Sequence, residues 1–325
     1  MRIKISADST CDLSPELIET YNIGITPLYI EKGGQNCRDG MDITPQEIFD
    51  YVRSGKGVCR TAAVNVGDYT AFFKKCRENY DAVIHFNISS DFSSCYQNAC
   101  TAAAEFENVY VVDSRNLSTG IALLVLDAAE RAEKGEDPKE IAALMRETAK
   151  KVEASFVIDT LFYLQKGGRC STLAALGANL LKLKPCIEVK DGKMGVGKKY
   201  RGKIDNCIAQ YVRERLQGRD DLRRNRIFIT HSGCAPEIVE NVKAIIKECG
   251  GFDEVLETYA GCTVSSHCGP NTLGGLFVRK EILKGFAFLG DPLIGSPTDG
   301  TSTGSSVMIF GRQKDFELCG ARPTF

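Results

Sequence analysis

The strongest constraint on the fold is a repeated order of apolar run, polar loop and helix in the first half of the chain. Residues 82–88 and 109–112 are near-continuous apolar runs, which are typical of strands buried on both faces. Residues 3–7 alternate like a strand, and each run is followed by a polar loop and a helical segment. This order predicts an α/β fold with a parallel sheet between helices.

Length and a change of pattern predict that the chain is divided into parts. Its 325 residues exceed what one hydrophobic core usually organises, so two domains are expected. Strands and helices alternate with more hairpin character after residue 155, which predicts a smaller mixed sheet. We expect an N-terminal domain over residues 1–154 and a second domain over residues 155–280. Residues 281–325 are rich in Gly, Ser and Thr and are expected to be extended or poorly ordered.

Charge and composition exclude several classes of protein. The 41 basic and 42 acidic residues give a net charge of −1, without the basic excess of a nucleic-acid-binding protein. No apolar run approaches the roughly 20 residues that cross a bilayer, and the N-terminus reads as a strand and not as a signal peptide. The 14 cysteines include no Cys-x-x-Cys pair, so free thiols are expected. We therefore expect a cytoplasmic protein without a membrane span or a nucleic-acid partner.

Motif spacing also disfavours a metal site and a nucleotide site. His267 lies between Cys262 and Cys268, but the chain has no second close ligand pair with zinc-finger spacing, so no metal is expected. A Lys-Gly-Gly-Arg segment at residues 166–169 precedes a predicted helix without the spacing of a P-loop.

Hydroxyl-rich loops at the ends of predicted strands are candidate binding sites. Asp8, Ser9 and Thr10 follow the first strand, and such loops face the ligand crevice in open α/β sheets. A helix-capping loop is the alternative interpretation. Four serines between residues 89 and 94 precede a helix predicted from residue 96. Their hydroxyls and the amides of the helix N-terminus predict a site for a carboxylate or a phosphate.

Residues 263–278 form a third candidate. They combine serine hydroxyls, the imidazole of His267, a Gly-Pro break and a short apolar strand. The local chemistry leaves two interpretations open, which are capture of a polar head group and a packed turn with a capping histidine.

Five motifs in order across residues 1–280 resemble those of the DegV family. They are Asp8-Ser9-Thr10-Cys11-Asp12-Leu13, residues 88–99, Val111-Val112-Asp113-Ser114, residues 163–169 and Ser266-His267-Cys268-Gly269-Pro270. The resemblance implies two α/β domains. The first would have a parallel sheet between helices, and the second a mixed six-stranded sheet with helices on one side.

The resemblance also implies a function. It is that of a bacterial fatty-acid-binding protein, the non-catalytic subunit that carries the acyl chain for a fatty acid kinase. The carboxylate would lie between the domains, and the acyl chain would enter a tunnel in the second domain. The implied partners are a long-chain fatty acid and the ATP-binding kinase subunit, which would form an acyl phosphate. Transient contact with a membrane surface is compatible with this role, and no cofactor is expected besides the bound fatty acid.

The residues that the resemblance assigns to the ligand are Thr61, Ser93, Ser94, Ser266 and His267. Asp8, Ser9 and Arg169 are expected to support the site, and Arg201 matches a basic position that engages the kinase. The chain departs from the family pattern after Thr61, where Ala62-Ala63-Val64-Asn65 stand in place of a Ser-x-Pro-Ser segment.

Two other functions use the same residues. A sensor or scaffold could bind another amphipathic carboxylate. A hydrolase could use Ser93, His267 and either Asp8 or Asp113 as a triad. The hydrolase is disfavoured because no Gly-x-Ser-x-Gly elbow surrounds Ser93.

Overall fold

A computed structural model describes residues 1–172 and 183–280, which belong to one compact unit. The expected tail over residues 281–325 lies outside the described residues. Within the described residues, no helix is long and apolar enough to cross a bilayer.

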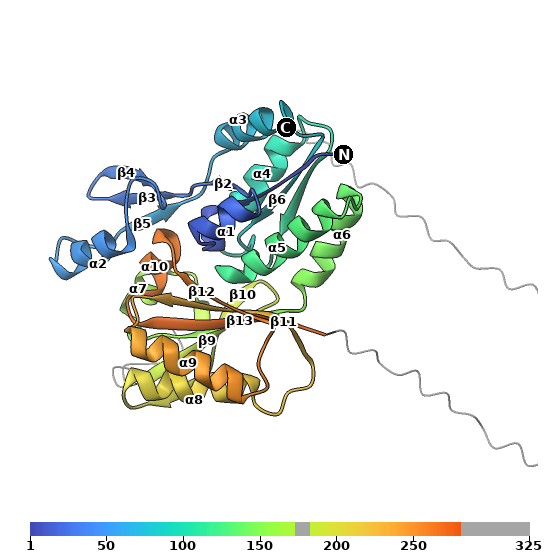
Figure 1. The fold of residues 1–325 in the computed structure, drawn as a ribbon. Coiled ribbons are helices and arrows are strands. Elements are labelled where there is room, and N and C mark those ends of the chain that lie inside the picture. The colour runs from blue at the N-terminus through green and yellow to red at the C-terminus, as the bar shows by residue number, and fades with distance from the viewer. Residues whose placement is uncertain (173–182, 281–325) are drawn as a thin grey trace, which may run out of the picture. The chain divides into compact units, whose positions relative to one another are not determined.

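The first half of the chain is built on a four-stranded parallel sheet (Figure 1). Its strands, in spatial order, are β2 (Gly24–Thr26), β1 (Ile3–Asp8), β6 (Ala82–Asn87) and β7 (Val109–Asp113). Every pairing in this sheet is parallel, and every residue of β6 is buried. The predicted parallel sheet is therefore confirmed, including the strand that the sequence predicts to be buried on both faces.

Helices cover both faces of this sheet. They are α1 (Pro15–Thr20), α3 (Val66–Arg77), α4 (Cys95–Ala103), α5 (Thr119–Glu133) and α6 (Pro138–Ala149). The pair α3 and α4 packs against one face, and α5 and α6 pack against the other. Helix α5 also contacts β8, β11 and β13 of a second sheet, described next, which explains why it is buried from Thr119 to Ala129.

The second sheet has six strands of mixed direction. In spatial order they are β10 (Lys193–Arg201), β9 (Leu183–Lys190), β8 (Val152–Val157), β13 (Thr272–Arg279), β11 (Leu222–Ser232) and β12 (Glu254–Tyr259). Only the β11–β12 pair is parallel. Helices α8 (Ile204–Leu216) and α9 (Pro236–Glu248) lie together on one side of it (Figure 1). The Asp191-Gly192 turn joins β9 to β10, and both residues have the positive φ that a two-residue hairpin turn requires.

A small antiparallel sheet was not predicted. It contains β4 (Gln35–Arg38), β3 (Tyr29–Lys32) and β5 (Arg60–Ala62), and α2 (Pro45–Arg53) accompanies it. The sequence predicts a single strand over residues 23–30, and this is wrong. Strand β2 ends at Thr26 because Pro27 has no N–H to continue the ladder, and β3 then joins a different sheet.

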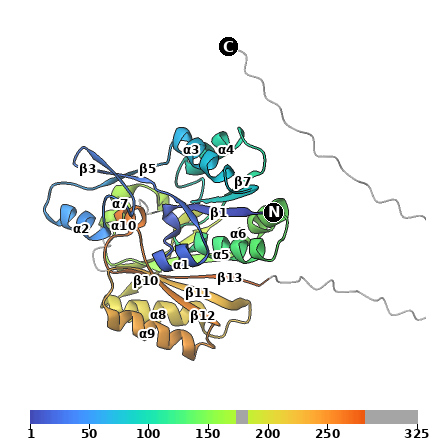
Figure 2. The ribbon, with the colours of Figure 1, turned by 45° about the horizontal axis from the view of Figure 1, so that its top comes forward.

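Three short helices lie near the small sheet. They are η1 (Ser9–Cys11), α7 (Phe162–Gly167) and α10 (Cys262–Cys268). Figure 2 shows α7 and α10 side by side, and the two helices contact each other. The histidine of residues 263–278 is therefore on a helix and not in a turn.

One apolar core extends across both large sheets. It includes Ile5 and Phe86 of the first sheet and Phe156, Phe228 and Leu276 of the second. The division of residues 1–280 into domains at residue 154 stays a prediction.

Candidate functional site

A cavity of about 130 Å³ brings together five of the residues expected at or beside the ligand. They are Thr61, Ser93, Ser94, Arg169 and His267. These residues come from β5, from the loop before α4, from the segment after α7 and from α10. Residues more than 200 positions apart in the sequence thus meet at one site.

The rest of the cavity wall is mainly apolar. The apolar lining residues are Leu28, Ala62, Ala63, Ile88, Phe92, Leu117, Met194, Val264 and Cys268. Three of them, Leu117, Val264 and Cys268, also border a void of about 20 Å³ next to Phe156 and Leu276 of the second sheet. The polar side chains of the cavity are therefore flanked by an apolar surface that continues toward the second sheet.

The side chain of His267 is held by a hydrogen bond and by close packing. Its Nε2 lies 2.9 Å from Oγ1 of Thr61, and its Nδ1 is buried without a hydrogen-bond partner among the described residues. Burial, with a smaller effect of the positive charge on Arg169, lowers the pKa of His267 to about 4. The imidazole is consequently neutral near pH 7.

The neutral ring has two tautomers, and the surroundings favour one of them. A proton on Nδ1 would leave a buried N–H without an acceptor, which is more costly than an unpaired lone pair. With the proton on Nε2, His267 donates to Thr61 instead. The hydroxyl proton of Thr61 is then free to point at a ligand in the cavity.

Gly167 allows the imidazole to lie where it does. A Cβ atom on Gly167 would be 2.0 Å from Nδ1 of His267, a distance that no real carbon contact shows. The Lys-Gly-Gly-Arg segment therefore makes two contributions to the site. Gly167 lets the backbone pass close to His267, and Arg169 lines the cavity.

Two buried carboxylates hold the N-terminus of α10. Asp39 accepts hydrogen bonds from the backbone N–H groups of Cys262 at 2.8 Å and Thr263 at 3.1 Å. Asp12 accepts one from the N–H of Gly261 at 2.8 Å. These bonds satisfy amides that a helix leaves unpaired at its start, and they fix the helix that carries His267.

The four serines before α4 divide into two pairs. Ser89 donates to the carbonyl of Gly192 at 2.8 Å and Ser90 to Asp113 at 2.6 Å, so both hold the loop. Ser93 and Ser94 line the cavity. The hydroxyl of Ser94 does not cap α4, and its backbone N–H has no acceptor among the described residues.

Other predicted residues lie outside the cavity lining. Ser266 donates to the carbonyl of Cys262 within α10, and Ser9 donates to Asp39. Asp8 accepts from the backbone N–H of Ile88 at 2.8 Å, and burial raises its pKa to about 6. Asp8 thus holds the end of the loop that follows β6, and Ser9 holds Asp39, although neither residue lines the cavity. Arg201 lies exposed at the end of β10.

Sequence reasoning missed Asp39 and Met194. Asp39 stands in an Arg-Asp-Gly sequence that resembles any surface turn, and Met194 is one alternate residue of a hairpin strand. The sequence around these two residues does not indicate their roles, because each role depends on a distant segment that packs against the residue.

The geometry does not form a hydrolase triad. His267 bonds Thr61, and Ser93 bonds the amide and thiol of Cys95, with no hydrogen bond between Ser93 and His267 in the described chain. Asp113 binds Ser90 and the amide of Arg115. Within residues 1–172 and 183–280, no three His, Cys, Asp or Glu side chains are grouped to hold a metal.

Proteins with similar sequences align with most of this chain. A DegV domain-containing protein of Caldanaerobacter subterraneus is 31% identical over 283 residues, which cover 86% of this chain and 99% of that protein. A Thermotoga maritima protein named as a fatty acid-binding protein is 30% identical over 284 residues, 84% of this chain and 96% of its own.

A solved structure has the same fold. It is described as showing fatty acid binding by a DegV family protein from Thermus thermophilus, and it matches with a TM-score of 0.79 at 30% identity. The match covers 86% of this chain and 100% of that one. The expected fold, a parallel sheet between helices with a mixed six-stranded sheet, is thus confirmed. The family model described as "Uncharacterised protein, DegV family" matches residues 2–280, and this chain belongs to the DegV family.

Proposed function

We propose that this protein binds a long-chain fatty acid with its carboxylate at Thr61, Ser93 and Ser94. The observation that carries the proposal is the cavity in which these hydroxyls and a neutral His267 meet an apolar wall. DegV relatives named or described as fatty-acid-binding proteins support it.

The head group is matched by hydrogen-bond donors. A carboxylate removed from water must be hydrogen-bonded or protonated. The hydroxyls of Thr61, Ser93 and Ser94 and the free amide of Ser94 supply donors without a full countercharge. The carboxylate thus keeps its charge and its ability to act as a nucleophile.

The acyl chain is matched by the apolar wall. Burial of each CH₂ group contributes roughly 0.8 kcal/mol, so the chain supplies most of the affinity. The cavity of about 130 Å³ is smaller than the roughly 300–1,000 Å³ typical of ligand sites. A long chain therefore requires side chains to move, and Leu117, Val264 and Cys268 are placed to open the void toward the second sheet.

We further propose that a separate kinase phosphorylates the bound carboxylate. The carboxylate would attack the γ-phosphorus of ATP held by the kinase, and ADP would leave with the bonding electrons. Arg169, at the cavity, would stabilise the negative charge of the transferred group. Arg201 would dock the kinase from the same strand that lines the cavity at Met194, roughly 20 Å along it. In this arrangement the DegV protein itself carries out no chemistry.

The test begins with the lipid that purifies with the protein. Mass spectrometry of the denatured protein should reveal a fatty acid, and delipidated protein should take up added oleate or palmitate. If no fatty acid co-purifies and added fatty acid does not bind, the proposal is ruled out. Hydrolysis of p-nitrophenyl esters that disappears in Ser93→Ala would instead support the hydrolase.

The kinase step has its own assay. Protein loaded with oleate is incubated with ATP and a candidate kinase subunit, and acyl phosphate is trapped with hydroxylamine. We expect Arg201→Ala to reduce acyl phosphate formation and to leave oleate binding unchanged. A protein that binds fatty acid but yields no acyl phosphate with any cognate kinase would be a sensor or scaffold.

A further inference from the structure

A second cavity, of about 540 Å³, lies apart from the fatty acid site. It shares no lining residue with the first cavity. Its walls are formed by strands β8 and β9, the Asp191-Gly192 turn, helix α8 and Arg279 of β13, together with Arg115 and Asn116 of the first half.

The charged residues of this cavity are mostly cationic. The cationic lining residues are Arg115, Lys150, Lys190, Arg215, Arg219 and Arg279. The acidic ones are Glu153, Glu188 and Asp191. The lining therefore carries three more positive than negative charges. Two carboxylates outside the lining, Asp221 and Glu147, pair with Arg219 and Lys150 and reduce this surplus to one.

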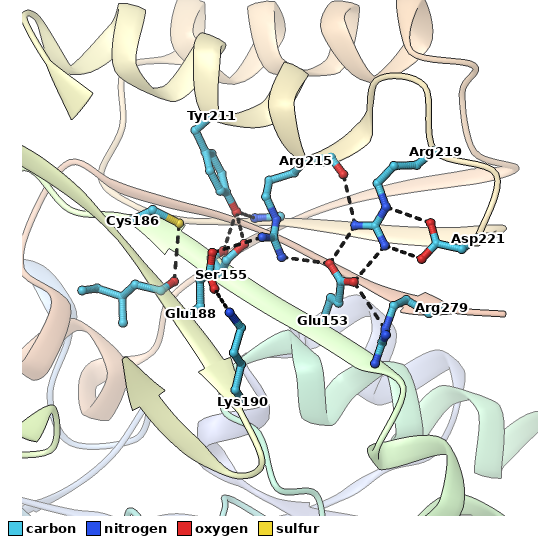
Figure 3. A network of polar contacts seen from close by, with 12 residues as sticks. Glu153, Ser155, Cys186, Glu188, Lys190, Tyr211, Arg215, Arg219, Asp221 and Arg279 are labelled. Carbon is cyan, nitrogen blue, oxygen red and sulfur yellow. Dashed lines mark hydrogen bonds and ion pairs between the residues drawn. The ribbon is translucent and has the colours of Figure 1, made fainter. Parts of the chain in front are cut away.

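Three arginines converge on one carboxylate, Glu153 (Figure 3). Arg215 and Arg219 each approach it at 2.8 Å, and Arg279 at 3.3 Å. Each guanidinium carries five N–H donors. Those of Arg219 bond Glu153, Asp221 and the carbonyl of Arg215, whereas Arg215 bonds only Glu153 and Glu188 among the described residues. Accordingly, Nε of Arg215 is buried without a hydrogen-bond partner among the described residues, whereas Nε of Arg279 is the atom that faces Glu153 at 3.3 Å. A buried donor of this kind calls for an acceptor.

Other cations at the cavity are available to a ligand. Arg115 forms no ion pair in the described part of the chain, and its side chain donates to the backbone carbonyl of Asp191. Lys150 and Lys190 pair with Glu147 and Glu188, but their side chains are 61% and 78% exposed. Exposed pairs of this kind contribute little and exchange easily.

We propose that this cavity binds a phosphate group. Guanidinium forks match the oxygens of a phosphate, and the surplus of positive charge favours a dianion. The described lining holds no aromatic side chain on which a nucleobase could stack. The volume accommodates orthophosphate, pyrophosphate or a small phosphomonoester, and this site is independent of the fatty acid site.

Calorimetric titration at low ionic strength tests the site. Full-length protein is titrated with orthophosphate, pyrophosphate and glycerol phosphate, and with sodium chloride at matched ionic strength. Saturable binding of at least one phosphate compound is expected, and the tightest of the three identifies the source. Saturation by none of them, or equal heats with chloride, would overturn the proposal.

Matched variants locate the binding. Arg115→Ala removes a cation without a carboxylate partner and should weaken phosphate binding about tenfold, the loss of one charged hydrogen bond. Asp191→Asn removes a negative charge at a left-handed position that Asn tolerates, and it should strengthen binding several-fold. Lys74→Ala, an exposed cation on α3, is the control and should have no effect.

The same variants separate this site from the first one. Oleate binding should be unchanged in all three, which also reports that each variant is folded. Equal weakening by Arg115→Ala and Lys74→Ala, or no effect of Asp191→Asn, would show a general charge effect and contradict the proposal.

Discussion

Thr61 and His267 lie 206 residues apart in the chain and share a hydrogen bond of 2.9 Å. The bond orients the Thr61 hydroxyl because the buried imidazole has a single partner among the described residues. At the scale of single residues, the candidate site therefore depends on a pair in which the imidazole of His267 orients the hydroxyl of Thr61.

Replacement of Thr61 by valine should weaken fatty acid binding. Valine keeps the shape of threonine and removes the hydroxyl, so the carboxylate loses one charged hydrogen bond. We expect affinity to fall about 10- to 100-fold, because such a bond contributes about 1.5–3 kcal/mol. Fluorescence displacement with a labelled fatty acid measures the change.

The control is Thr101→Val, on the exposed side of α4, whose hydroxyl donates to the carbonyl of Gln97. Equal affinity in the Thr61 and Thr101 variants would remove Thr61 from the site.

Gly167→Ala tests the close approach to His267. Alanine is the better helix former, so local propensity alone favours the substitution. The new Cβ would nevertheless collide with Nδ1 of His267 and displace the ring from Thr61. We expect weaker fatty acid binding, measured by the same displacement assay. Gly195→Ala, where no atom of the described neighbours lies within 4 Å of the added Cβ, should leave affinity unchanged. Tolerance of both substitutions would mean that the position of His267 is unimportant.

At the scale of elements, α10 is held by residues of the first half. Asp39 accepts from two of its amides and from the hydroxyls of Thr263 and Ser9. Three of these donors belong to α10, so Asp39 links the small sheet region to the helix of His267.

Asp39→Asn should therefore loosen α10. The amide of asparagine presents an NH₂ group where the carboxylate accepts hydrogen bonds, so at least one buried donor loses its acceptor. We expect the free energy of unfolding to fall by about 1–3 kcal/mol, measured by urea denaturation, and fatty acid affinity to fall with it. Asp42→Asn, whose carboxylate pairs with Arg38 at the exposed surface, should change little. An unchanged unfolding midpoint in Asp39→Asn would refute the anchoring role.

Some elements could be predicted from sequence and others could not. The buried run of β6 follows a local rule, and the structure confirms it. Ser14 and Thr44 also follow local rules, since each caps a helix that begins with proline. The small sheet and α10 depend on contacts with distant segments, and their strands and turns are too short for periodicity to show. The resemblance predicted five residues of the cavity, Thr61, Ser93, Ser94, Arg169 and His267, whereas the contacts of Asp39 and Ser266 required coordinates.

At the scale of the whole molecule, stability should depend on the ionisation of His267. Its pKa is about 6.5 in the unfolded chain and about 4 in the folded protein. The unfolded state therefore binds more protons between these values. The contribution is fully present above pH 6.5 and is lost as pH falls toward 4.

A comparison with His267→Gln isolates this effect. Glutamine does not titrate, so the difference in unfolding free energy between the two proteins should grow in favour of the wild type from pH 4 to pH 6.5. The upper limit is about 3 kcal/mol, since each pKa unit corresponds to 1.36 kcal/mol. A difference that is flat over this range would mean that His267 is not held neutral. The raised pKa of Asp8 acts in the opposite direction, but it is common to both proteins and cancels.

The contacts of α10 also determine when during synthesis the site can exist. Asp12 and Asp39 bond groups that follow them by 249 and 223 residues. At about 5–20 residues per second, Asp39 waits roughly 10–45 s for its partners to leave the ribosome. A nascent chain that has already formed its parallel sheet still lacks the helix that completes the cavity. If the proposed function holds, interrupted translation products will not capture fatty acid, because the cavity is complete only in chains synthesised past His267.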